Sequence, residues 1–234
     1  MASKKPKKSA VEPLKTTCSG IDIYDLSPYQ VEGHPKTKRW RGRTVRRKLE
    51  DVTGVCVHQT DVTFGVARYQ IKEAGGDAER AQVLRALNVA AHMTVFNEGW
   101  AVQAFPWESY VNGGNGFNSF CLHLEIEGRY RGLTGDPRTG PSNATGLDGL
   151  TYKTACEGLR YMVESAREAG APIADIFCHR QSSATRRRDP GQEIYEAVVL
   201  GFAPTIGLTP RPLRVMDAGR PVPRQWDPSG AGQY

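Results

Sequence analysis

Short apolar runs, separated by turns rich in polar residues and glycine, recur along most of this chain. Runs rich in β-branched residues predict buried strands, and longer stretches with apolar residues on one side predict helices. The predicted strands cover 53–59, 120–127 and 173–178, and the predicted helices cover 78–88, 152–169 and 192–202. Asp77 is a suitable N-cap for the first helix, and Gly170 is expected to end the second. Two alternating runs around residues 97–99 predict a hairpin.

Strands interleaved with helices indicate the α/β class, with a mixed central β-sheet flanked by helices. A chain of 234 residues is expected to form one main domain with extensions. We place that domain at 50–203, between a basic N-terminal extension over 1–49 and a Pro/Gly-rich C-terminal tail over 204–234. The tail is expected to be an extended wrap or a flexible end. Residues 1–16 have little to bury and are expected to be disordered.

Positive charge is concentrated near the N-terminus. Residues 1–50 hold 13 Lys and Arg against 5 Asp and Glu, a balance of +8, and since the whole chain carries +6, residues 51–234 carry −2. The basic cluster at 36–48 contains one tryptophan. Such a patch attracts nucleic acid, anionic lipid or the phosphate-bearing polymers of a cell envelope. The alternative is a solvated arm without a partner.

Cysteine content and apolar runs bear on the cellular compartment. The cysteines number 5, an odd count, and most of them lie in apolar segments, so we expect reduced thiols. No apolar run approaches the roughly 20 residues that a membrane span requires. The N-terminus begins with positive charge but has no apolar stretch behind it, so no secretory signal is predicted and the chain is expected to be cytoplasmic at synthesis.

Three separated residues form a candidate metal site. Apolar runs lead directly into His58 and His179, and Asp189 stands just before a Pro-Gly turn. Two imidazoles and one carboxylate are a zinc set that leaves one coordination position open, as in catalytic sites. Cys56 or Cys178 is an alternative ligand, since each flanks a histidine. The plainer alternatives are buried core histidines and an Asp189 that caps the helix after it.

Four segments bear a resemblance to a known family: V-C-V-H-Q-T, A-A-H-M-T-V-F-N-E-G-W-A-V-Q, N-S-F-C-L-H-L-E-I-E-G and H-(x)9-D-P-G. In order and spacing they are similar to the zinc-dependent N-acetylmuramoyl-L-alanine amidases of the type 2 class. Phage lysozyme-amidases, bacterial anhydromuropeptide amidases and peptidoglycan recognition proteins share that fold. The resemblance covers about residues 50–203.

By position, the resemblance implies that His58, His179 and Asp189 hold Zn²⁺. It implies a catalytic role for Glu125, as general base and acid, and it places Arg187 where the family has a catalytic lysine. Glu127 shares the strand face of Glu125, so the alternation alone does not choose between them. The sequence departs from the family at Ala91, where tyrosine is frequent, and at His179-Arg180-Gln181, where His-Ser-Asp is usual.

The implied function is hydrolysis of the amide bond between N-acetylmuramic acid and L-alanine in peptidoglycan, by a phage endolysin or cell-wall lysin. Two alternatives stay open. One is a cytosolic amidase that recycles anhydromuropeptides, and the other is a non-catalytic module that binds peptidoglycan. The sequence does not determine the oligomeric state.

Overall fold

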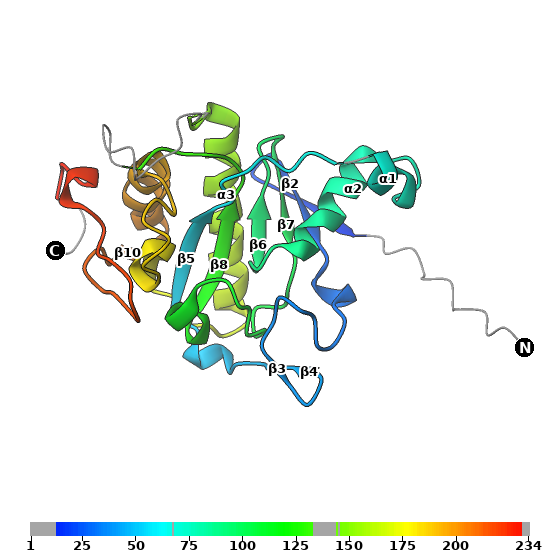
Figure 1. Cartoon of the computed structure of the whole chain (residues 1–234), viewed down its shortest axis with the longest axis horizontal. Coiled ribbons are helices and arrows are strands. Elements are labelled where there is room, and N and C mark those ends of the chain that lie inside the picture. Colours follow the sequence, from blue (N-terminus) through cyan, green and yellow to red (C-terminus); the bar gives the residue numbers. More distant parts are fainter. Residues whose placement is uncertain (1–12, 67, 133–143, 145, 231–234) are drawn as a thin grey trace, which may run out of the picture.

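An eight-stranded mixed sheet organises the chain, in the strand order β1-β2-β7-β6-β8-β5-β9-β10. The computed structural model describes residues 13–66, 68–132, 144 and 146–230 (Figure 1). The strands are β1 Leu14–Cys18, β2 Ile21–Asp25, β3 Arg39–Trp40, β4 Arg43–Thr44, β5 Gly54–Gln59, β6 Met93–Val95, β7 Trp100–Gln103, β8 Cys121–Ile126, β9 Asp175–Cys178 and β10 Thr209–Pro210. The helices are α1 Arg68–Glu73, α2 Ala78–Arg85, α3 Gly149–Glu168 and α4 Gln192–Ile194, the last continued by a π-helical segment, Tyr195–Phe202.

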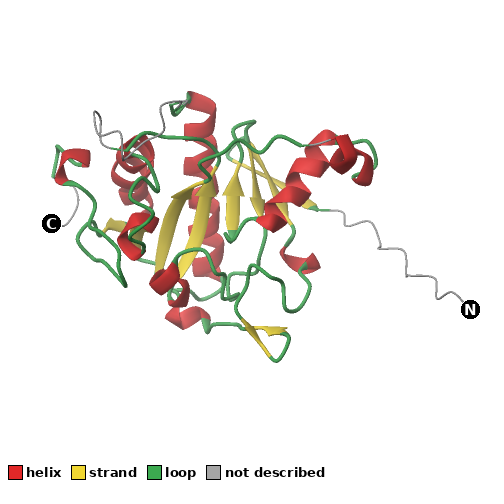
Figure 2. Cartoon of the chain, viewed as in Figure 1, coloured by secondary structure: helices red, strands yellow, loops and turns green. Residues whose placement is uncertain are grey.

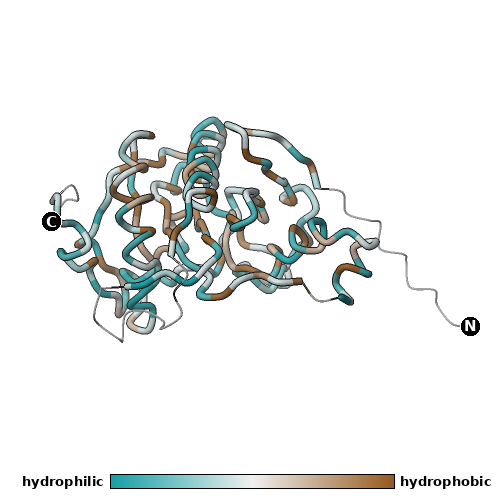
Figure 3. The backbone as a smooth tube through the Cα atoms, turned by 90° about the horizontal axis from the view of Figure 1, so that it is seen from above, coloured by the Kyte–Doolittle hydropathy of each residue, from teal (hydrophilic) through white to brown (hydrophobic). Residues whose placement is uncertain are grey.

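The two faces of β5 have different partners. Val55 and Val57 belong to the main core, which also contains Leu159 and Met162 of α3. Cys56 lies in a smaller apolar cluster on the other side of the sheet. Because side chains alternate along a strand, His58 is directed to the same side as Cys56, away from α3. Figure 2 shows α3 crossing behind the strands, and Figure 3 shows apolar and polar positions alternating along the helices, as expected of elements that bury one side.

The α/β class predicted from the sequence is confirmed, and so are the elements that position the site. Strand β5 occupies most of the predicted span 53–59, and β6 and β7 form the predicted antiparallel hairpin. Asp77 caps α2, where its carboxylate accepts a hydrogen bond from the backbone of Arg80 at 3.0 Å. Helix α3 begins three residues before the predicted start at 152, because the Asp148 carboxylate caps it through the backbone N–H of Thr151.

The expected boundary at residue 50 does not separate an extension from the sheet. Residues 14–25 form β1 and β2, and β2 pairs in parallel with β7. An uncovered β7 would present a row of unpaired backbone groups, which β2 satisfies. The sequence I-D-I-Y-D over 21–25 has the alternation of such a strand, with Ile21 and Ile23 buried. Residues 1–12, most of the segment expected to be disordered, lie outside the described residues.

The C-terminal tail wraps onto the sheet and the turn that follows β9. Strand β10 pairs in parallel with β9, and Trp226 is fully buried against the core. Most of residues 131–149 lie outside the described part of the chain. Within the described part of the chain, no helix combines the length and the apolar character that crossing a membrane requires.

Candidate metal centre

Strand register brings the predicted ligands together at one edge of the sheet. β5 lies between β8 and β9 and is parallel to both, so the carboxyl ends of the three strands meet. In this register His58 lies beside Glu125. Val57 lies beside Cys178, so His179, the next residue after β9, arrives at the level of His58. Ligand sites in open sheets of this kind lie beyond the carboxyl ends of strands.

His58, His179 and Asp189 converge on one point. The Nδ1 atoms of His58 and His179 are 2.9 Å apart, and His179 Nδ1 is 2.8 Å from Asp189 Oδ2. His58 Nδ1 is 4.0 Å from the same oxygen. Each Nδ1 has a single in-plane site, so His179 Nδ1 cannot form hydrogen bonds with both partners at once. These three donors could hold one metal ion, and nitrogen and oxygen ligands of this kind occur in zinc sites.

The pKa values of two of the three candidate ligands, His58 and Asp189, are shifted. Burial lowers the pKa of His58 well below its ordinary value, and the neighbouring His179 lowers it further. Burial alone would raise the pKa of Asp189, but the hydrogen bond from His179 and the nearby imidazoles bring it below its ordinary value. The result is a neutral imidazole and an ionised carboxylate, the forms that bind metal.

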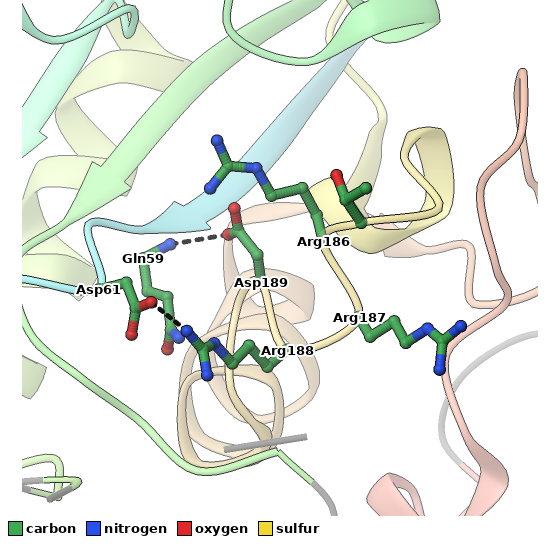
Figure 4. Close-up of a pocket in the computed structure, with 7 residues that line it drawn as sticks. Gln59, Asp61, Arg186, Arg187, Arg188 and Asp189 are labelled. Carbon is green, nitrogen blue, oxygen red and sulfur yellow. Dashed lines mark hydrogen bonds and ion pairs between the residues drawn. The ribbon is translucent and has the colours of Figure 1, made fainter. Parts of the chain in front are cut away.

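Asp189 is held in place by the strand end rather than by the helix that follows. Its Oδ1 accepts a hydrogen bond from the backbone N–H of Gln59 at 2.9 Å, which leaves Oδ2 to face the imidazoles (Figure 4). Helix α4 begins after Gly191, and no side chain caps it. Asp189 therefore does not serve as the helix cap that was the alternative interpretation.

A second group of possible donors shares His58. The donor atoms of Cys56, His58 and His123 all lie within 4.8 Å of one another, on the interior side of the His58 ring. All three residues are buried, and burial raises the pKa of the Cys56 thiol well above its ordinary value. A thiol kept protonated is a poor ligand, because metals bind the thiolate. The donors of His58, His179 and Asp189 could hold an ion without the deprotonation of a buried thiol.

The group of His58, His179 and Asp189 opens into a cavity of about 390 Å³. Its lining includes the three candidate ligands together with Glu125, Lys36 and Arg186. Burial raises the pKa of the Glu125 carboxyl well above its ordinary value, and Asp189 raises it further, against the opposing effect of Arg186. Among the described residues, none gives the Glu125 carboxylate a hydrogen bond or an ion pair. The Glu125 carboxyl therefore faces the cavity without a partner among the described residues.

The structure distinguishes Glu125 from Glu127. The carboxylate of Glu127 accepts hydrogen bonds from the backbone N–H groups of Phe64 and Asn97, the latter at 3.1 Å. Glu127 lies just after the end of β8, and these hydrogen bonds connect it to two loops. Its oxygens are thus committed to backbone groups, whereas those of Glu125 are available to a substrate.

The structure does not bring the Arg187 side chain into the cavity. Figure 4 shows Arg186 extending over Asp189, while Arg187 points away from it. Arg186 is also close enough to Glu125 and His58 to lower the pKa of both. The backbone turns between Ser183 and Asp189, and neighbouring side chains leave that turn in different directions. Spacing in the sequence alone did not reveal which arginine faces the site.

The C-terminal tail supports the turn that carries His179. Arg180 is buried, stacks at 4.7 Å on the Trp226 ring, and donates to the carbonyl oxygens of Pro221 and Arg187. The backbone N–H of Met216 donates to Gln181 at 2.8 Å. The sequence pattern did not predict this role of Arg180. Its position directly after a candidate ligand was the available signal.

The fold and the site define an α/β protein with a candidate three-donor metal centre at the carboxyl edge of its sheet. No protein-family model matches the chain, and no curated protein matches it. Solved structures similar to it include endolysin amidases and peptidoglycan recognition proteins.

Three of these structures illustrate the range. An endolysin N-acetylmuramoyl-L-alanine amidase from Clostridium intestinale has 13% identity and a TM-score of 0.43, over 73% of this chain and 88% of that one. The Ph2119 endolysin from a Thermus scotoductus bacteriophage has 18% identity and a TM-score of 0.37, over 65% and 85%. Drosophila PGRP-LB has 12% identity and a TM-score of 0.45, over 86% and 98%.

Proposed function

We propose that this protein is a zinc-dependent N-acetylmuramoyl-L-alanine amidase. The observation that carries the proposal is the convergence of His58, His179 and Asp189 beside Glu125 in one cavity. The choice of substrate rests on the four sequence segments that resemble the type 2 amidases. A lysin that degrades the cell wall is the form of this function that we propose first.

In the proposed reaction, His58, His179 and Asp189 would hold the zinc ion, which would supply a Lewis acid for the amide carbonyl and lower the pKa of bound water. Glu125 takes a proton from the attacking water and returns it to the departing amine of L-alanine. The raised pKa of Glu125 makes it a better proton acceptor than an exposed glutamate. Arg186 supplies fixed positive charge for the oxyanion that develops on the carbonyl oxygen.

The two neighbouring arginines give a matched test of that charge. We expect Arg186→Ala to lower kcat by about 100-fold, within the range known for the loss of an oxyanion donor. Arg187→Ala should leave kcat within about threefold of wild type, because its side chain points away from the cavity. Steady-state kinetics on a soluble muropeptide measure both. The reverse order of effects would restore Arg187 to the role implied by the family resemblance.

Hydrolysis assays separate the proposed function from its alternatives. Zinc-loaded protein is incubated with intact sacculi and, in parallel, with soluble muropeptides, and new L-alanine amino termini are measured by mass spectrometry. A lysin releases stem peptides from sacculi. Activity on the soluble fragment alone would indicate the recycling enzyme, and binding to sacculi without hydrolysis would indicate the non-catalytic module.

The basic cluster adds a proposed contact with anionic polymers of the cell wall. Residues 39–44 form the β3–β4 hairpin at the lower edge of Figure 1, where Trp40 is 69% exposed. Arg39, Arg41 and Arg43 are exposed around it. Cationic groups flanking an exposed aromatic ring suit a polymer that carries both phosphates and sugar rings.

This contact predicts salt-sensitive binding. In Arg39→Ser/Arg41→Ser the slope of log affinity against log salt should fall by roughly one for each arginine that contacts a phosphate. The control, Arg68→Ser/Lys72→Ser, removes two exposed charges from α1 instead. Binding to a phosphate-rich wall polymer and to duplex DNA is measured for each. A preference for DNA, or an equal effect of the control, would contradict the proposed contact.

A further inference from the structure

The interior side of the His58 ring faces a second histidine. His58 Nε2 is 3.1 Å from His123 Nδ1, and the two rings meet edge to face with centroids 5.2 Å apart. His123 is fully buried on β8, two residues before Glu125. The proposed mechanism assigns this residue no role, although it contacts a candidate ligand directly.

The tautomer of His58 depends on which of its ring nitrogens faces the candidate ion. If Nδ1 binds the ion, the proton of the neutral ring is on Nε2, and that N–H needs an acceptor in a buried place. Within the described part of the chain, His123 Nδ1 is the atom that lies at hydrogen-bond distance from it. His123 then carries its own proton on Nε2, which has no hydrogen-bond partner among the described residues.

The surroundings hold the His123 ring in one orientation. A Cβ added at Gly113 would lie 3.0 Å from its Cγ, and one added at Gly114 would lie 2.6 Å from its Cε1. The His92 ring stacks on the His123 ring at a centroid distance of 5.6 Å, and His92 Nδ1 accepts a hydrogen bond from the backbone N–H of His123 at 3.0 Å. A ring packed this closely cannot turn away from His58 without displacing backbone.

An unpaired buried N–H group lowers the stability of a folded protein. His123 leaves its Nε2 unpaired while its Nδ1 faces the candidate ligand His58. Its effect on His58 therefore explains its presence better than a contribution to stability does.

We propose that His123 is a positioning residue for the metal centre: its Nδ1 accepts a hydrogen bond from His58 Nε2 and thereby fixes the tautomer and orientation in which His58 Nδ1 faces the ion. The proposal rests on the proposed metal site. It concerns affinity for the ion and the position of a proton, so it is tested without an assay of hydrolysis.

Zinc affinity in two variants provides the first test. His123→Leu removes the acceptor, and zinc affinity of the full chain, measured by chelator competition, should fall about 10- to 100-fold. His123→Asn keeps an acceptor near the position of Nδ1 and should restore affinity to within about threefold of wild type. Thermal unfolding of the zinc-free variants identifies any that fail to fold. Wild-type affinity in a folded His123→Leu variant would overturn the proposal.

Nitrogen NMR of zinc-loaded wild-type protein provides a second test that needs no variant. With ¹⁵N-labelled histidine, the proposal expects His58 protonated on Nε2, His123 protonated on Nε2, and a scalar coupling between His58 Nε2 and His123 Nδ1. A proton found on His123 Nδ1 would overturn the assignment. Wild-type protein that binds no zinc at all would instead overturn the metal site, so the two failures are distinguishable.

Discussion

Replacing Glu125 by glutamine is expected to lower turnover of the muramoyl-alanine amide by about 10²- to 10⁴-fold while the protein keeps its zinc. The glutamine side chain has the same shape but cannot accept the proton of the attacking water. Glu125 is not one of the three donors that converge on the candidate ion, so metal content should not change. Kinetics on a soluble muropeptide and zinc analysis of the same preparation measure the two properties.

The pH dependence of turnover gives this prediction a second readout. The base must be ionised to act, so activity falls as the pH drops through the pKa of Glu125. Because burial and Asp189 raise that pKa, the acid limb should lie at higher pH than for an ordinary glutamate. Glu125→Gln should lose this limb.

Glu127 supplies the matched control, since it is also acidic and lies two residues away in the sequence. Its carboxylate binds the backbone of Phe64 and Asn97, so Glu127→Gln should lower the free energy of unfolding while kcat stays near that of wild type. Undiminished turnover in Glu125→Gln, or a large loss of kcat in a folded Glu127→Gln variant, would move the base role away from Glu125.

Removing a metal donor should have the largest effect of all. His179→Ala is expected to lose stoichiometric zinc and to lower hydrolysis by roughly a thousandfold or more, since Lewis-acid assistance is worth several kcal/mol and about 1.4 kcal/mol corresponds to a factor of ten. His179 Nδ1 contacts both other donors, so its loss leaves His58 and Asp189 without a shared centre.

Cys56→Ala distinguishes the two possible metal groups, because only the interior group uses this thiol. We expect this variant to retain zinc and activity at close to wild-type levels. Zinc lost from Cys56→Ala and kept by His179→Ala would place the ion in the interior group and remove the basis of the proposed hydrolase. Metal analysis of both variants after dialysis against a weak chelator decides between these outcomes.

Local sequence was sufficient to predict the strands that carry the site. The apolar run before His58 specifies β5, and the run over 173–178 specifies most of β9, because alternation and β-branching act within a few residues. Both strands are confirmed. The assignment of His58, His179 and Asp189 as ligands, made first from the residues and then from the resemblance to the amidases, stays a prediction, as does the role of Glu125.

Other features depend on contacts between segments far apart in the chain, so they are known from the folded structure alone. The backbone N–H groups of Phe64 and Asn97 donate hydrogen bonds to the Glu127 carboxylate, and these bonds distinguish Glu127 from Glu125. The turn before Asp189 directs Arg186, and not Arg187, over the site. Strand β2 joins the sheet because β7 leaves an open edge. A sequence pattern predicts on which face of a helix or strand a residue lies. Which residues lie opposite that face depends on strand register and packing, which are set by the whole chain.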